Sequence, residues 1–180
     1  MTNQKTNSQA ILLDADVLIH FSKGQTIALL KQIYPQYEKW VLPGVKREIL
    51  HRKTINDLNF AINYKVIKEI DLPAVDTDVY REYARLKRDN PKIGEGEAQC
   101  LAFLRYNSHV LASSNLRDIR QYCETYKITY LTTLDLLSEA MRSNVLTEEE
   151  CDKFIEDVLK QNSKLPCSYM FEYTNPTFLD

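Results

Sequence analysis

The sequence is poor in the residues that interrupt regular structure. Its 180 residues include only 4 Gly and 6 Pro, and no stretch rich in Gly, Ser or Pro divides the chain. Such a stretch is the usual mark of a linker between domains. We therefore expect a single domain over residues 1–180 with short connections, in which 1–9 form a polar leader and 162–180 an irregular tail.

Long apolar runs and paired cysteines are also missing. No apolar run approaches the roughly 20 residues that a membrane-spanning helix needs, and the first residues lack the hydrophobic core of a secretory signal. The four cysteines show no paired spacing, which is typical of reduced thiols: Cys100, Cys123, Cys151 and Cys167. These absences predict a cytoplasmic protein with no membrane partner.

Charge of one sign is not in excess. The formal net charge is −2, which gives no overall attraction to nucleic acid, because phosphate binding needs clustered Lys and Arg. The densest basic run is Arg81, Arg85, Lys87 and Arg88. It is either a solvated helix face or a rim that follows a phosphate backbone.

Apolar patterns of two periods alternate along the chain. Strands are predicted over 10–13, 40–42, 66–70, 109–112 and 128–131. Helices are predicted over 17–22, 27–33, 45–51, 58–64, 76–89, 98–106, 118–122, 134–141 and 148–160. Gly24 is expected to end the first helix in a left-handed conformation. The alternation predicts an α/β fold with a five-stranded parallel sheet between helices.

Acidic residues stand where these strands end. Asp14 follows the apolar strand 10–13, Glu48 and Glu97 lie on helices, and Asp118 follows the strand 109–112. Because ligands of parallel sheets bind at the carboxyl ends of the strands, we expect these acids at one edge. Each acid alone is explained equally well as a helix cap or by the helix dipole.

The kinds of residue available favour a hard metal ion. A set of carboxylates suits Mg²⁺ or Mn²⁺, which bind oxygen and keep several waters. The three histidines, His20, His51 and His109, are dispersed without metal-type spacing, so we interpret them as surface or packed residues.

Four segments, taken in order, resemble the PIN-domain family of metal-dependent nucleases. They are ILLDAD (11–16), PGVKRE (43–48), GEAQCLA (96–102) and VLASSNLRD (110–118). The segment YLTTLDLLSEAMRSNVLTEEE (130–150) is similar to the last strand and helices of the family. The resemblance spans nearly the whole chain and implies a PIN-like three-layer sandwich.

The resemblance also implies the site residues. The catalytic acids would be Asp14, Glu48, Glu97 and Asp118, and the metal would be held by Asp14, Glu97, Asp118 and Asp16. Ser113, Ser114 and Asn115 would surround these acids.

The activity that the resemblance implies is hydrolysis of RNA phosphodiester bonds by a metal-activated water. Candidates for guiding the RNA are Arg81, Arg85, Arg88 and Arg117. Many compact members of the family are toxins of toxin–antitoxin pairs, so an antitoxin protein is an expected partner, and a homodimer is a further one.

Three alternatives stay open at this point. Many PIN members carry acids where this chain has Ser114 and Asn115, which favours a catalytically weakened scaffold that binds RNA or protein. The segment ILLDADVLI (11–19) also fits the signature of haloacid-dehalogenase-like phosphatases, although that family has no role for Glu48 or Glu97. The third alternative is a plain α/β domain.

Overall fold

A five-stranded parallel sheet forms the centre of the molecule. The computed structural model describes residues 9–180, except for the side chain of Asp118. The strand order is β3-β2-β1-β4-β5, and every pair of neighbours is parallel. The strands are β1 (Ala10–Leu13), β2 (Glu38–Val41), β3 (Lys68–Glu69), β4 (Val110–Ala112) and β5 (Tyr130–Leu131).

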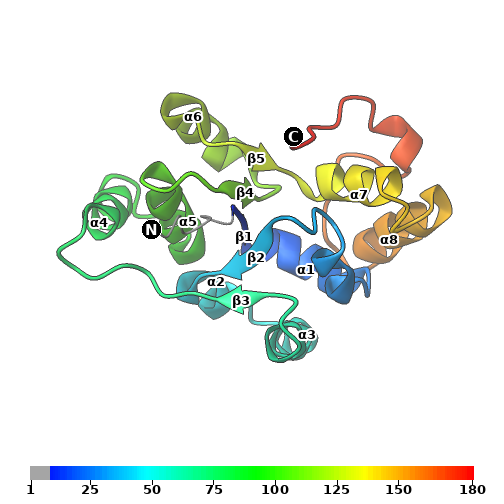
Figure 1. Ribbon diagram of the computed structural model, residues 1–180, viewed down its shortest axis with the longest axis horizontal. Helices are drawn as coiled ribbons and strands as arrows, with labels where there is room; N and C mark the ends of the chain where they lie inside the picture. Colours follow the sequence, from blue (N-terminus) through cyan, green and yellow to red (C-terminus); the bar gives the residue numbers. More distant parts are fainter. Residues whose placement is uncertain (1–8) are drawn as a thin grey trace, which may run out of the picture.

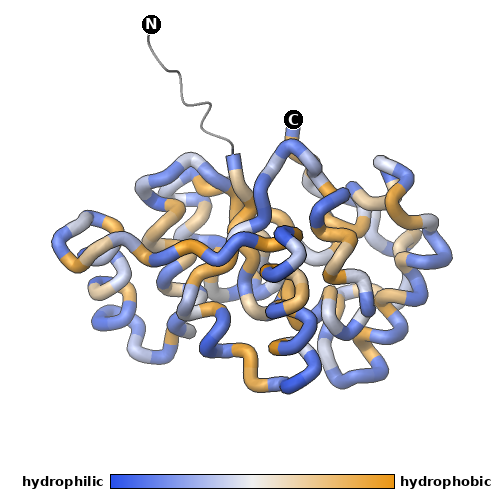
Figure 2. The backbone as a smooth tube through the Cα atoms, turned by 60° about the horizontal axis from the view of Figure 1, so that its bottom comes forward, coloured by the Kyte–Doolittle hydropathy of each residue, from blue (hydrophilic) through white to orange (hydrophobic). Residues whose placement is uncertain are grey.

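The predicted first strand is confirmed, and it is the central strand of the sheet. All four residues of β1 are buried, since helices cover both faces of a parallel sheet. Figure 2 shows hydrophobic chain gathered around this centre and hydrophilic chain at the periphery. The predicted leader lies outside the described residues except for Gln9, whose carbonyl accepts a hydrogen bond of 3.2 Å from the Glu38 amide.

Helices form the layers on either side of the sheet (Figure 1). Helices α4 (Asp78–Asp89) and α5 (Glu95–Arg105) lie on one side, and α1 (Ala15–Lys23), α7 (Thr133–Arg142) and α8 (Glu148–Lys160) on the other. The remaining helices are α2 (Pro43–Glu48), α3 (Arg52–Asn63) and α6 (Leu116–Tyr126), with 3₁₀ turns η1 (Ile27–Lys31) and η2 (Met170–Glu172). The α/β fold expected from the sequence is confirmed.

Two local predictions near the first helix are wrong. The α-helix predicted over 27–33 is absent, and the short 3₁₀ helix η1 (Ile27–Lys31) stands in its place. Gly24 has a φ of −73°, and the left-handed residue is its neighbour Gln25, with a φ of 59°. Gly24 is small for another reason, because the Phe154 ring of α8 occupies the space where a Cβ would stand.

The irregular tail lies across α7. The Tyr173 hydroxyl and the Thr177 amide both donate to Asp135 Oδ1, at 2.8 and 2.6 Å. The aromatic residues of the tail are expected from the sequence to pack on the body of the protein, and Met170 between them is buried, but Tyr169 and Phe171 are 52% and 69% exposed. Only part of the predicted aromatic packing therefore forms.

One buried ion-pair cluster joins the helices α4, α5 and α6. Glu82 accepts hydrogen bonds from Arg85 of its own helix and from the Tyr122 hydroxyl of α6, and it forms an ion pair of 2.6 Å with Arg105 of α5. Arg85, first among these partners, lowers the pKa of Glu82 to about 2. This cluster fixes α6 relative to α5, and the candidate site lies where these two helices begin.

No helix among residues 9–180 combines the length and the apolar character needed to cross a membrane.

Candidate functional site

The candidate site lies where the order of the strands reverses. From β1 the chain continues to β2 on one side, and it later returns to β4 on the other side. The loops that leave β1 and β4 therefore diverge and open a crevice at the carboxyl edge, which is where parallel sheets bind ligands. Asp14 follows β1 and Ser113 follows β4, so the two residues face each other across this crevice.

Asp14 is held from both sides of the crevice. Its Oδ2 accepts a hydrogen bond of 2.9 Å from the Ser113 hydroxyl, and its Oδ1 accepts one of 2.8 Å from the Ala15 amide at the start of α1. Burial raises the pKa of Asp14, and the negative charge of Glu48 adds to the rise. Asp14 is therefore both a helix cap, as the plain interpretation proposed, and a member of an acidic cluster.

Asp16 is held by the loop that follows β4. Its Oδ2 accepts a hydrogen bond of 2.7 Å from the Ser114 amide, and its Oδ1 accepts one of 2.7 Å from the Val17 amide. Burial and the charge of Asp14 raise the pKa of Asp16 to about 7. Ser114 thus stands beside the acids and orients one of them through its backbone.

Glu48 comes from the end of α2 and lies across the start of α5. Its Oε1 accepts a hydrogen bond of 3.1 Å from the Gly96 amide. A Cβ on Gly96 would come within 2.8 Å of Glu48 Oε2 and within 2.7 Å of Val45 Cα. Gly96 is therefore a site residue that the sequence analysis missed, and the Gly-Glu-Gly-Glu run over 94–97 was the signal.

Glu97 and Asn115 connect α5 to α6. Asn115 Nδ2 donates to Glu97 Oε2 at 3.3 Å, and the Asn115 amide donates to Ser113 Oγ at 3.3 Å. Glu97 is only 8% exposed. The fourth predicted acid, Asp118, lies in the first turn of α6, and its side chain is outside the described part of the structure.

A buried cysteine lies within electrostatic range of the acids. Burial raises the pKa of the Cys100 thiol, and four negative charges raise it further, those of Asp14, Glu48, Glu97 and Asp16. Cys100 lies in α5, so one buried side chain is in electrostatic range of all four acids. Asp14 is also in electrostatic range of Glu48, and Glu97 lies on the same helix as Cys100.

A second network supports the site from α7. The Ser114 hydroxyl contacts Thr133 Oγ1 at 2.9 Å, and Thr133 Oγ1 contacts His20 Nδ1 at 2.8 Å. Burial lowers the pKa of His20 to about 4. His20 is packed, as interpreted from the sequence, whereas the role of Thr133 had no signal other than its place at the start of a helix.

The chemistry of the acids fits a divalent cation. The donors are carboxylate oxygens, and among the described residues Asp14, Asp16 and Glu48 take part in no ion pair with Lys or Arg. A cation would relieve the charge concentrated around Cys100. Within the described residues, no three His, Cys, Asp or Glu side chains are close enough together to hold a metal ion as they stand.

The predicted RNA-guiding arginines fall into two groups. Three on α4 are in ion pairs: Arg81 with Asp78, Arg85 with Glu82 and Asp89, and Arg88 with Asp89. Arg117 is exposed in the first turn of α6, beside the acids. Of the four, only Arg117 takes part in no ion pair of the described residues, and it stands two residues after Asn115, which contacts Glu97.

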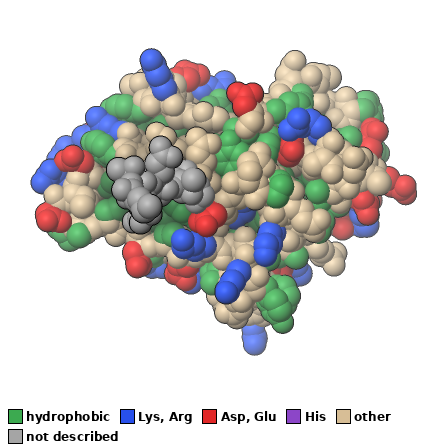
Figure 3. Space-filling model, in the orientation of Figure 1, with side chains coloured by type: hydrophobic (Ala, Val, Ile, Leu, Met, Phe, Trp, Pro, Cys, Tyr) green, Lys and Arg blue, Asp and Glu red, His purple; other side chains and the backbone are tan. Residues whose placement is uncertain are grey.

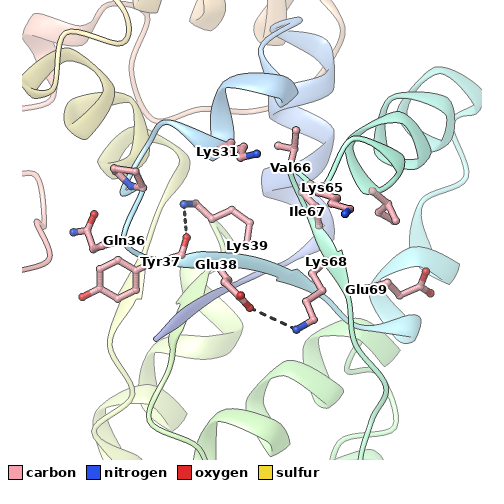
Figure 4. Close-up of a pocket in the computed structure, with 12 residues that line it drawn as sticks. Lys31, Gln36, Tyr37, Glu38, Lys39, Lys65, Val66, Ile67, Lys68 and Glu69 are labelled. Carbon is pink, nitrogen blue, oxygen red and sulfur yellow. Dashed lines mark hydrogen bonds and ion pairs between the residues drawn. The ribbon is translucent and has the colours of Figure 1, made fainter. Parts of the chain in front are cut away.

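A well-formed pocket lies at the other edge of the sheet (Figure 4). It has a volume of about 580 Å³, and its lining includes Tyr37–Lys39, at the start of β2, and Val66–Glu69, which contain β3. Lys68 and Glu38 form an ion pair across it at 3.7 Å, and Lys39 is held by the Tyr37 carbonyl. Since the acids stand at the carboxyl ends of the strands, this pocket is separate from the candidate site.

Fold and site together define an α/β protein with a carboxylate cluster at the carboxyl edge of a parallel sheet. A family model described as a PIN domain matches residues 10–168, and the chain belongs to the PIN-domain family. Members of this family are in general nucleases that use divalent metal ions. The interpretation as a haloacid-dehalogenase-like phosphatase is therefore wrong. No curated protein matches the chain.

Proposed function

We propose that the protein is a metal-dependent ribonuclease that hydrolyses RNA phosphodiester bonds. One observation carries the proposal: the segment after β4 holds three acids at the crevice of the sheet, Asp14 through the Ser113 hydroxyl, Asp16 through the Ser114 amide and Glu97 through the Asn115 side chain. A structural role explains each acid alone, but it gives no reason to gather negative charge in a buried place, where repulsion and burial both cost free energy.

The proposed roles follow from the contacts of each acid. Asp14, Asp16, Glu97 and Asp118 would hold Mg²⁺ or Mn²⁺, and Glu48 would complete the catalytic set. A bound cation of this kind supplies a nucleophilic water at neutral pH and neutralises charge on the phosphate. Ser113 keeps Asp14 directed into the crevice, and Asn115 does the same for Glu97. Glu97 or Asp118 orients the attacking water.

A catalytically weakened scaffold is the second candidate. It was suggested by Ser114 and Asn115, which stand where many members carry acids. The Ser114 amide holds Asp16, however, and the Asn115 side chain holds Glu97. These contacts support the view that the two residues orient the remaining acids, and they favour the nuclease.

The partners of the nuclease are part of the proposal. We propose that RNA is the substrate, that an antitoxin protein restrains the activity, and that the protein acts in the cytoplasm, where its four free cysteines would stay reduced. Figure 3 shows hydrophobic side chains at the surface in the region of α3. A homodimer is supported by the apolar side chains that are exposed on and beside this helix: Leu50, Phe60 and Tyr64. The Phe60 and Tyr64 rings lie 4.2 Å apart.

Cleavage of a mixed RNA pool by the purified protein tests the proposal. We expect cleavage in Mn²⁺ or Mg²⁺ that EDTA stops and that Glu97→Gln abolishes. The matched control is Glu95→Gln, which lies in the same turn of α5 but pairs with Arg47 on the surface. Full activity of the Glu97→Gln protein, or no cleavage by a folded wild type free of partners, would contradict the proposal.

A further inference from the structure

The arginines of the molecule differ in whether their charge is already neutralised. On α4, Arg81, Arg85 and Arg88 pair with acids of the same helix. On α6, neither Arg117 nor Arg120 forms an ion pair or a hydrogen bond within the described residues, and both are exposed. In a chain of net charge −2, these two guanidinium groups remain available for an anion from outside.

Arg117 and Arg120 stand on the helix that leaves the acid site. The chain passes from Ser113, which holds Asp14, through Asn115, which holds Glu97, directly into α6. Arg117 and Arg120 are three residues apart, so they lie on one face of α6 as neighbours in successive turns. They therefore form a short basic line that begins at the acids.

A shallow pocket of about 390 Å³ lies along this line. Its walls are Leu116, Arg117, Arg120, Gln121 and Glu124. Arginine is suited to phosphate because its planar fork donates two parallel hydrogen bonds. The charge of Glu124, one turn beyond Arg120, would repel a phosphate, so the favourable path runs from Arg120 toward the acids.

The depth of the site limits which nucleic acid can use this path. Asp14 is 5% exposed, and Glu97 is nearly as buried. A strand must therefore bend from the surface of α6 into the crevice. Unpaired nucleotides can be splayed out in this way, whereas a duplex holds its backbone in a fixed helix.

We propose that single-stranded RNA enters the acid site along α6 and that Arg117 and Arg120 bind its backbone phosphates. This inference rests on the proposed ribonuclease function. It makes the two arginines positioning residues, and it assigns no such role to the paired arginines of α4.

The experiment compares the double variant Arg117→Gln/Arg120→Gln with the control Arg81→Gln/Arg88→Gln. Cleavage of a fluorescein-labelled oligouridylate is followed in Mn²⁺, and binding of the same probe is followed by anisotropy in EDTA at several KCl concentrations. We expect the α6 variant to raise KM by about fivefold or more with kcat little changed. In a plot of the logarithm of the binding constant against the logarithm of the KCl concentration, the slope for this variant should be smaller in magnitude by about 1.4. This is the difference expected for the loss of two contacts to phosphates of a single strand.

Two further arms separate charge from structure. Arg117→Lys/Arg120→Lys should restore most of the affinity and the salt slope, because lysine keeps the charge, whereas a variant damaged in folding would not recover in this way. Annealing the probe to its complement should suppress cleavage. Equal cleavage of the duplex would overturn the single-strand inference.

The outcomes distinguish this inference from the proposed function. If the wild type cleaves the probe and the α6 variant matches the α4 control in KM and salt slope, the path along α6 is wrong and the nuclease stands. If the wild type itself neither cleaves nor binds the probe, both fail together.

Discussion

The Ser113 hydroxyl donates a hydrogen bond of 2.9 Å to Asp14 Oδ2 across the crevice where the strand order reverses. The bond joins the loop after β1 to the loop after β4. Two strands that are neighbours in space, but 99 residues apart in the chain, thereby share one fixed carboxylate. Removing the Ser113 hydroxyl therefore tests this contact directly.

Ser113→Ala should lower kcat for RNA cleavage by about tenfold, because Asp14 keeps its contact with the Ala15 amide but loses the one that directs Oδ2. The free energy of unfolding should fall by about 1 kcal/mol, the usual loss for one buried hydrogen bond. Steady-state kinetics and urea unfolding measure the two effects. Ser138→Ala, which removes only a bond to the Leu134 carbonyl within α7, should leave kcat unchanged.

Asp16→Asn should stabilise the metal-free protein at pH 8. The pKa of Asp16 is raised in the fold to about 7 from an ordinary value of 3.8, so its charge costs stability progressively as the pH rises through that window. The variant should melt higher than the wild type in EDTA at pH 8, with no gain at pH 4. Added Mn²⁺ should raise the melting temperature of the wild type more than that of the variant. A variant that melts lower at pH 8 would contradict the burial of this charge.

His20 should make the protein sensitive to mild acid. Its pKa in the fold is lowered to about 4 from 6.5, so the unfolded chain takes up the proton first as the pH falls. Stability is lost across that window, by about 2 kcal/mol between pH 7 and pH 5. His20→Asn should remove this part of the loss, and His51→Asn, an exposed position, should retain it. Urea unfolding at pH 7 and pH 5 measures the loss of free energy of unfolding. If the His20→Asn protein loses as much as the wild type, His20 is not the source of the acid sensitivity.

Glu82→Gln should destabilise the fold by about 2 kcal/mol, because Arg85 and Arg105, whose side chains are partly exposed, lose their charged hydrogen bonds to the buried Glu82 carboxylate. Since the pKa of Glu82 is lowered to about 2, its contribution is present above an ordinary pKa of about 4.5 and is lost as the pH falls toward 2. Glu156→Gln, a surface pair on α8, should change the unfolding free energy little. The measurement is thermal unfolding of the two variants. Equal melting temperatures for Glu82→Gln and Glu156→Gln would show that the cluster around Glu82 does not stabilise the fold.

The sequence by itself determined the sheet and its order of elements. The apolar run Ala10–Leu13, Pro43 at the start of α2, and the capping box of Thr147 and Glu150 are local signals, and each element formed where its signal stood. One prediction that failed, an α-helix over 27–33, rested only on the period of its apolar residues. The segment forms the 3₁₀ helix η1, which buries Ile27 and Leu30.

Only the tertiary structure decided how the site residues are used. The sequence placed acids at one edge, but it could not show that the Ser114 amide holds Asp16 or that Gly96 is small to admit Glu48. It also ranked the four basic candidates alike, whereas the fold pairs three of them on α4 and leaves Arg117 free beside the acids. The physical reason is separation along the chain. Helix caps and apolar periods depend on residues within one helix or strand, whereas these contacts join residues that are distant in the sequence and meet only when the sheet has formed.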